Sequence, residues 1–266
     1  MTPTLSVVLP WLICPTCQRR GCENPLARDG RSLRCPEHHC LDIAKQGYVT
    51  MTSTPAGANA DTVEMIAARQ RVLDAGLFGD LDARLAEILI GRDRIVEVGA
   101  GTGHHLAQVL EAHPDSHGLA SDVSKAAIRR AAKAHPRMAA VVADTWAGLP
   151  IRTGCIDAGL CVFAPRNRDE FARIMKPDGI FVVVTPLPDH LQQLRERTGM
   201  IGIQPHKHDE LMAALASRFT VIGHEEVRAD IPLDKQTASD AVAMGPSATT
   251  STTFMSMPCP SRQLWK

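Results

Sequence analysis

Three cysteines and one histidine near the start of the chain constrain how this segment folds. They follow the spacing C-x2-C-x17-C-x3-H, with candidate ligands at Cys14, Cys17, Cys35 and His39. Each short pair forms a tight knuckle that directs two side chains to one point, and three thiolates with one imidazole suit a closed tetrahedral Zn²⁺ site. The spacing therefore predicts a structural zinc-binding module over residues 1–50, with the apolar segment 4–13 as its lead-in strand. His38 is the competing candidate for the fourth ligand position.

Composition restricts the class of protein. The chain has 266 residues, enough for one α/β domain and a small appendage. Most of its eight cysteines crowd into the first forty residues in metal-binding spacing, so we expect a reducing cytoplasm and not a disulfide-linked secreted protein. Cys22 and Cys40 lie beside the ligands and are interpreted as spare thiols. No apolar run is long enough to span a bilayer, so no membrane partner is expected.

The balance of charge also excludes one function. The formal net charge is zero, which argues against a protein that coats nucleic acid without specificity, although it permits a basic patch on one face. Five arginines lie in the loop between the two zinc knuckles, at Arg19, Arg20, Arg28, Arg31 and Arg34. They are interpreted either as a solvated surface or as a face that contacts phosphates.

Beyond residues 51–60, which have the composition of a linker, strand and helix patterns alternate. Predicted strands cover 94–98, 117–121, 138–143, 156–162, 179–185 and 219–223. Predicted helices cover a segment that Asp61 caps, then about 80–90, 103–112, 125–134, 169–175 and 209–217. This alternation over residues 61–245 predicts an α/β domain with a mostly parallel sheet and helices on both faces. The tail 246–266 is atypical, with 250–257 as a candidate last strand.

A glycine-rich loop follows the first predicted strand of this domain. Gly99, Gly101 and Gly103 permit a sharp turn and a close approach to a ligand at the N-terminus of the next helix. The spacing G-x-G-x-G, with Glu97 two residues earlier, differs from the dinucleotide pattern G-x-G-x-x-G and is typical of class I S-adenosylmethionine (SAM) methyltransferases with a Rossmann-like fold. A degenerate fold that binds no cofactor is the alternative.

Two acidic residues support the prediction of SAM binding. Asp122 ends the second strand of the domain, where its carboxylate can accept both ribose hydroxyls. Asp144 ends the third strand, within reach of the adenine amino group. The dipeptide 149–150 and the tetrapeptide 176–179 fall where this fold usually has Leu-Pro and Lys-Pro-Gly-Gly, although Asp178 replaces a glycine.

The order of zinc module, linker and SAM domain resembles the bacterial 23S ribosomal RNA (guanine-N1)-methyltransferases of the RlmA family. Besides the zinc ligands and the glycine loop, the resemblance depends on 42–48, 64–65, Arg69, 73–76, 122–125, 163–165, 185–186 and 190–191. It extends from the zinc module to about residue 245. His104-His105, 129–137 and 163–167 are most similar to the actinomycete branch, the tylosin-type resistance methyltransferases, which act on hairpin 35 of the rRNA and protect producers from macrolides.

The resemblance implies a function and a set of site residues. It implies methylation of guanine N1 in the hairpin 35 region of 23S rRNA, macrolide resistance, and a possible homodimer. The expected cofactor-binding residues are Phe78, Glu97, Gly99, Gly101, Thr102, Gly103, His104, Asp122, Asp144 and His190. Phe163 is a candidate to stack on the guanine and His190 a candidate to accept its proton. For Phe163 and Phe78 the alternative is core packing, and for His190 an inert surface position.

Two other functions compete with rRNA methylation. The first is a SAM-dependent methyltransferase of a small molecule, and the second is a zinc-dependent binding protein with an inactive methyltransferase fold. A basic zinc module counts against the first, because small substrates rarely need one. The presence of Glu97, Asp122 and Asp144 counts against the second.

Overall fold

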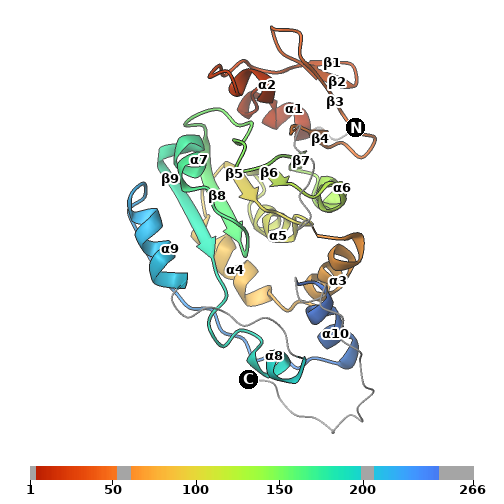
Figure 1. The fold of residues 1–266 in the computed structure, drawn as a ribbon, viewed down its shortest axis with the longest axis vertical. Helices are drawn as coiled ribbons and strands as arrows, with labels where there is room; N and C mark the ends of the chain where they lie inside the picture. The colour runs from red at the N-terminus through yellow and green to blue at the C-terminus, as the bar shows by residue number, and fades with distance from the viewer. Residues whose placement is uncertain (1–3, 53–60, 199–206, 246–266) are drawn as a thin grey trace.

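A six-stranded sheet forms the centre of the molecule (Figure 1). The computed structural model describes residues 4–52, 61–198 and 207–245. The strand order is β4-β7-β6-β5-β8-β9, and every neighbouring pair is parallel, as the alternation predicted. The strands are β4 (Val49–Thr50), β5 (Arg94–Val98), β6 (His117–Asp122), β7 (Met138–Val142), β8 (Ile156–Val162) and β9 (Met175–Val184).

Three helices that lie between the strands in the chain cover one face of this sheet. They are α4 (Gly79–Ile88), α5 (His104–Ala112) and α6 (Lys125–Ala134). Alternate strand residues such as Ile95 and Ala120 point to this side and are buried against Leu106 and Ile128. Ser124 caps α6 by accepting a hydrogen bond from the Ala127 N–H at 3.3 Å.

The zinc module and one helix cover the opposite face. The module contains α1 (Thr4–Val8), the 3₁₀ turn η1 (Leu9–Trp11), α2 (Pro15–Gln18) and an antiparallel ribbon of β1 (Ala27–Asp29), β2 (Ser32–Arg34) and β3 (Cys40–Asp42). It shares this face with α7 (Arg168–Ile174) (Figure 1). Leu12 and Leu33 of the module belong to the same buried core as Val96 and Val141 of the sheet. The module therefore forms a layer of the fold.

Polar contacts fasten the module to the loop that follows β7. The Ile13 N–H donates to the Pro150 carbonyl at 3.0 Å, and the Gln18 side chain donates to the Leu149 carbonyl at 2.7 Å. Glu23 accepts hydrogen bonds from Thr153 and forms an ion pair with Arg173. The strand β4, which the sequence pattern did not predict, continues the module into the edge of the sheet by pairing with β7.

Two sequence predictions were wrong in the first part of the chain. Most of segment 4–13 is helical and not a lead-in strand, because α1 and η1 cover residues 4–11 and only Leu12 and Ile13 form isolated β-bridges. Leu5 and Val8 are buried one turn apart while Val7 is exposed, which is the period of a helix. Asp61 does not cap α3 (Val63–Asp74), because the neighbouring Thr62 accepts the Met65 N–H at 3.2 Å and the Asp61 carboxylate pairs with Arg69.

The predicted strand at 219–223 is also absent. Residues 219–234 have no regular secondary structure, and Ile222 is 80% exposed. Two ion pairs with distant segments, Arg84–Glu225 and Arg228–Asp189, hold this stretch to the surface without pairing it to β9. The strand β9 begins four residues before its predicted start, since Met175 pairs with Ile156 and the next residues bulge before Ile180 pairs with Ala158.

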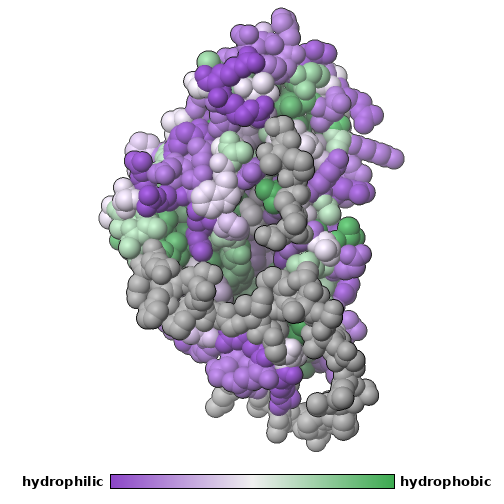
Figure 2. Space-filling model, viewed as in Figure 1, coloured by the Kyte–Doolittle hydropathy of each residue, from purple (hydrophilic) through white to green (hydrophobic). Residues whose placement is uncertain are grey.

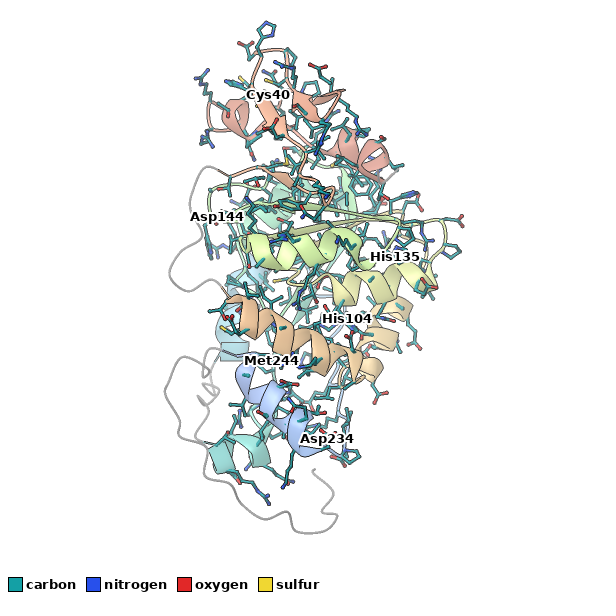
Figure 3. The ribbon with its side chains drawn as sticks, turned by 90° about the vertical axis from the view of Figure 1, so that its right-hand side faces the viewer. Cys40, His104, His135, Asp144, Asp234 and Met244 are labelled. Atoms are coloured by element: carbon teal, nitrogen blue, oxygen red, sulfur yellow. The ribbon has the colours of Figure 1, made fainter. Side chains whose placement is uncertain are left out.

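The remaining helices are α8 (Gln192–Thr198), α9 (Lys207–Ala216), which confirms a predicted helix, and α10 (Lys235–Ala243), which was not predicted. Of these, α8 and α10 lie below the sheet and α9 lies beside β9 (Figure 1). Asp234 caps α10, and Figure 3 shows the helix running from Asp234 to Met244 beside α3. Arg71 of α3 holds the buried Asp240 through two hydrogen bonds of 2.8 and 2.6 Å. The candidate strand at 250–257 lies outside the described residues.

Candidate functional site

The four predicted zinc ligands converge in the upper module. The His39 Nδ1 atom lies 3.5, 3.3 and 3.3 Å from the Sγ atoms of Cys14, Cys17 and Cys35, and the last two sulfurs are 3.8 Å apart. A tetrahedral zinc with ordinary bond lengths requires edges of about 3.8 Å between sulfurs and about 3.6 Å from sulfur to nitrogen. The cluster therefore has the size of a tetrahedral zinc site, and its three buried thiols fit a structural metal.

Three residues near the candidate zinc ligands in the sequence lie outside the ligand group. His38 is exposed and has a positive φ of 61°, so the backbone turns its side chain away and leaves the position to His39. Cys22 and Cys40 are exposed and lie outside the ligand group. The Asn24 side-chain amide donates to the Cys17 sulfur at 3.2 Å, which would stabilise a metal-bound thiolate from outside the ligand set.

The glycine loop joins β5 to α5 at the carboxyl edge of the sheet. The Gly99 and Ala100 N–H groups both donate to the Ser121 carbonyl, which fastens the loop to β6. A Cβ atom on Gly99 would lie 2.3 Å from the Cβ of Ala164, so the loop after β8 is in direct contact with it. At Gly101, φ is +54° and a Cβ would meet only the Arg69 side chain, at 3.5 Å. The loop is therefore closed by protein at Gly99 and open at Gly101.

The backbone around Asp122 fixes the orientation of its carboxylate. One carboxylate oxygen accepts the Gly101 N–H at 2.9 Å and the other accepts the Ser124 N–H at 2.8 Å. Burial raises the pKa of this carboxyl, although both N–H donors oppose the shift. Because each oxygen has a further lone pair, the oriented carboxylate can still accept two hydroxyl groups. The Thr102 hydroxyl is buried without a partner among the described residues, which leaves a polar atom of the loop to be satisfied.

Glu97 lies beneath the glycine loop and is 1% exposed. It accepts a hydrogen bond from the Leu106 N–H of α5 at 3.2 Å. Burial raises its pKa to about 8, and the nearby carboxylates of Asp82 and Asp122 add to the shift. Glu97 therefore links β5 to α5 as a carboxyl that is protonated near neutral pH in the cofactor-free protein.

The raised pKa of Glu97 predicts how stability varies with pH. The folded protein holds this proton between the ordinary carboxyl pKa of 4.5 and about 8, whereas the unfolded chain releases it. The free energy of unfolding should therefore fall as pH rises through this window, by at most about 1.4 kcal/mol per pH unit. Glu97→Gln should flatten the decline, measured by urea unfolding across the window. Glu196→Gln, at an exposed position, is the control, and an equal slope in wild type and Glu97→Gln would refute the assignment.

Aromatic rings gather at the same edge of the sheet. The Phe78 ring centroid lies 5.7 Å from that of Phe163, 6.4 Å from His190 and 5.9 Å from His105. Phe163 and His190 follow β8 and β9, and their centroids are 5.9 Å apart. Phe163 has a positive φ of 52° and is 43% exposed, so it is not a core residue. Burial lowers the pKa of His190, which favours a neutral imidazole near pH 7.

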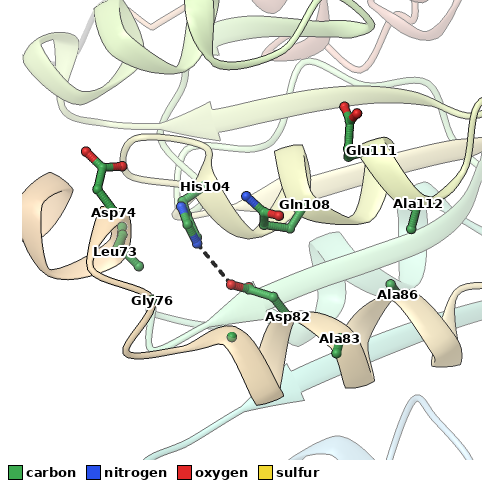
Figure 4. Close-up of a pocket in the computed structure, with 11 residues that line it drawn as sticks. Leu73, Asp74, Gly76, Asp82, Ala83, Ala86, His104, Gln108, Glu111 and Ala112 are labelled. Atoms are coloured by element: carbon green, nitrogen blue, oxygen red, sulfur yellow. Dashed lines mark hydrogen bonds and ion pairs between the residues drawn. The ribbon is translucent and has the colours of Figure 1, made fainter. Parts of the chain in front are cut away.

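The remaining expected cofactor residues lie in two places. Asp144 follows β7, accepts the Trp146 N–H at 2.9 Å and lies at the opposite edge of the sheet from His135 (Figure 3). The His104 ring does not point to the carboxyl edge: its Nε2 lies 2.9 Å from the Asp82 carboxylate of α4 (Figure 4). Asp82 was missed from the sequence, since a single acid inside a helix gives no signal until its partners are known.

Three relatives share most of the chain. A protein of Streptomyces fradiae named 23S rRNA (guanine(748)-N(1))-methyltransferase is 43% identical over 91% of this chain and 86% of its own. A Micromonospora griseorubida protein, provisionally named a 23S rRNA (guanine-N(1)-)-methyltransferase, is 41% identical over 91% of this chain and 88% of its own. A Bacillus subtilis protein with the same provisional name is 32% identical over 69% of this chain and 67% of its own.

Two family models match the two parts of the fold. Residues 12–52 match the zinc ribbon described as RlmA, N-terminal, and residues 95–179 match a methyltransferase domain. Sheet, glycine loop and zinc cluster together define a class I SAM-dependent methyltransferase with an N-terminal structural zinc ribbon. Within that class, the chain belongs to the family of 23S rRNA (guanine-N1)-methyltransferases. No helix in the described ranges is long and apolar enough to cross a membrane.

Proposed function

We propose that this enzyme transfers a methyl group from SAM to N1 of a guanine in the hairpin 35 region of 23S rRNA, in the cytoplasm, and that the product confers macrolide resistance. The observation that carries the proposal is the similarity over 91% of the chain to the Streptomyces fradiae enzyme, through both the zinc ribbon and the methyltransferase domain. A homodimer stays a prediction.

The carboxyl edge of the sheet fits the cofactor. SAM supplies an electrophilic methyl group on a sulfonium. We assign the ribose hydroxyls to the oriented carboxylate of Asp122 and the adenine amino group to Asp144. The glycine loop, through Gly99, Gly101, Thr102 and Gly103 and the backbone of His104, would border the methionine and ribose portions, with Glu97 supporting it from below. Phe78 would border the cofactor from the opposite side.

The aromatic rings next to this edge fit the target base. Guanine N1 lies on the Watson–Crick edge, so the base must be unpaired or flipped out to reach the methyl group. The exposed Phe163 offers a ring for stacking. His190 lies beside it with a neutral imidazole that can accept the N1 proton as the new N–C bond forms. Both residues follow strands that end at the same edge of the sheet, so both would lie beside the bound cofactor.

The zinc ribbon offers a basic surface for the RNA. Figure 2 shows hydrophilic residues over the upper end of the molecule, where α2 and β1–β3 lie. Arg34 pairs with Asp29 at 2.7 Å, and Arg28 donates to the Gly30 carbonyl. Arg19, Arg20 and Arg31 are exposed and have no ion-pair partner among the described residues, so they are free to contact phosphates.

Removing these three charges should weaken RNA binding. The triple variant Arg19→Gln, Arg20→Gln, Arg31→Gln should bind the rRNA fragment less tightly, with a salt dependence reduced by about 0.7 to 0.9 in log–log slope for each lost phosphate contact. Its SAM affinity should not change. Arg34→Gln is the matched control, because its guanidinium is already paired. An unaltered salt dependence in the triple variant would remove the ribbon from the docking surface while leaving the activity in place.

A labelling experiment tests the substrate class. The protein is incubated with methyl-labelled SAM and with either 23S rRNA or a macrolide. The proposal requires label in the rRNA and none in the drug. Label in the macrolide alone would support the small-molecule methyltransferase, and label in neither would support an inactive binding protein.

A further inference from the structure

A second group of metal-ligating side chains lies behind the glycine loop. Asp82 is on α4, and His104 and His105 are the first two residues of α5. The Asp82 carboxylate oxygens lie 2.9 Å from His104 Nε2 and 2.6 Å from His105 Nδ1. One ligand atom from each of the three residues lies within 4.8 Å of the others. The side chains are only 8%, 13% and 11% exposed, so the group is enclosed.

Among the described ion pairs, Asp82 is paired only with the two histidines of this group. None of the ion pairs that the structure describes joins Asp82 to a lysine or arginine. A buried carboxylate is stabilised by a nearby positive charge, which a divalent cation would supply.

We propose that Asp82, His104 and His105 bind a divalent transition-metal ion of the zinc, nickel or cobalt class. Two imidazoles and one carboxylate form a donor set that such ions prefer, and a dication balances the buried charge. The site is distinct from the zinc ribbon, which contributes sulfur ligands. To bind the metal, the ring nitrogen of each histidine that now faces Asp82 must be free of a proton. A neutral ring achieves this by moving its proton to the other ring nitrogen, and a doubly protonated ring achieves it by releasing one proton.

An open cleft leaves room for the remaining ligands. Asp82 and His104 line a cleft of about 700 Å³ between α4 and α5. Figure 4 shows the His104 ring directed at Asp82 across this cleft, with the Gln108 side chain beside it on the same helix. The Gln108 amide oxygen or water can complete the coordination. Glu111 points away from Asp82 in the same view and lies 3.3 Å from His135 instead.

The ion would act on the cofactor loop through α5. The bound ion would join α4 to the first residues of α5, which begins immediately after Gly103, the last glycine of the loop. The ring of His105 also meets Phe78 edge-on at 5.9 Å, next to the cofactor edge. A filled site therefore holds both the loop and Phe78 in place.

Metal stoichiometry tests the proposal. Tag-free protein with its zinc ribbon filled is titrated with Co²⁺ at pH 7.5, followed by calorimetry, elemental analysis and visible absorption. The proposal requires a second metal equivalent whose spectrum shows nitrogen and oxygen coordination without the thiolate charge-transfer band of an exchanged ribbon. Asp82→Asn, His104→Gln and His105→Gln should each weaken this second equivalent by at least about tenfold, while His117→Gln leaves it unchanged.

Two results would overturn the proposal, and the first does not depend on any variant folding. Wild-type protein that binds one metal only would show that the three side chains form a hydrogen-bonded cluster and nothing more. A second equivalent that is retained in all three ligand variants, or lost in His117→Gln, would place the ion elsewhere. Circular dichroism of each variant checks that its fold is intact.

Discussion

Cys35→Ser is expected to lose the bound zinc and to destabilise the whole molecule. The apparent binding free energy of a structural zinc is about 10 kcal/mol or more, which is comparable to the total stability of an ordinary domain. The ribbon does not unfold alone, because Cys14, Cys17 and Cys35 belong to the same core as the sheet residues Val96 and Val141. Elemental analysis should show one zinc fewer per chain than in the wild type, and thermal unfolding followed by circular dichroism should show the sheet melting at a much lower temperature.

Cys40→Ser is the matched control for this experiment. Cys40 lies on β3, only five residues from Cys35, but its thiol is exposed and outside the ligand group. It should keep one zinc and the wild-type melting curve. Full zinc content in Cys35→Ser would contradict the ligand assignment, and zinc loss with an unchanged sheet would contradict the shared core.

Gly101→Val is expected to abolish tight binding of SAM. The residue has a φ of +54°, and a Cβ atom there would lie 3.5 Å from the Arg69 side chain, so a branched side chain strains the turn and would crowd the position proposed for the ligand. A forced contact of this kind costs about 1–3 kcal/mol, or roughly 5- to 150-fold in affinity. Isothermal titration calorimetry with SAM measures the loss directly.

Gly91→Val separates backbone strain from ligand exclusion. Gly91 has a φ of +74° and no atom within 4 Å of a built Cβ, so the substitution brings the same strain at a site far from the loop. Its SAM affinity should match that of the wild type once both proteins are folded. Equal affinities in Gly101→Val and wild type would mean that the cofactor does not pass this loop.

The sequence predicted the parts of the fold that have a strict spacing. The zinc ligands needed no structure, because two knuckles of fixed length determine which side chains meet. Buried strands such as 94–98 were confirmed because continuous apolar runs between turn signals are typical of a parallel sheet.

The errors arose where distant contacts decide the local structure. Segment 4–13 is apolar enough for a strand, but its contact with β6 and β7 requires a helical period. At 219–223 the apolar residues have no strand to pair with, so the chain stays irregular. The helix α10 has a weak pattern and depends on the pairing of Asp240 with Arg71, which lies 169 positions earlier.

The candidate site also contains residues that could be predicted from the sequence and residues that could not. The glycine loop, Asp122 and Asp144 could be found from sequence, since the ends of parallel strands meet at one edge. The alternative of core packing for Phe163 could not be decided until its exposure was known. The role of His104 depends on Asp82, a residue of another helix, and no spacing in the sequence connects the two.

Primer extension on 23S rRNA tests the central claim most directly. Methylation at N1 blocks the Watson–Crick edge of guanine, so reverse transcriptase stops at the modified base. Primer extension on RNA incubated with the enzyme and SAM should show one new stop in the hairpin 35 region that is absent from untreated RNA. A nucleoside digest of the treated RNA should contain N1-methylguanosine. An unchanged pattern on 23S rRNA, with the same protein shown to be folded and to bind SAM, would contradict the account.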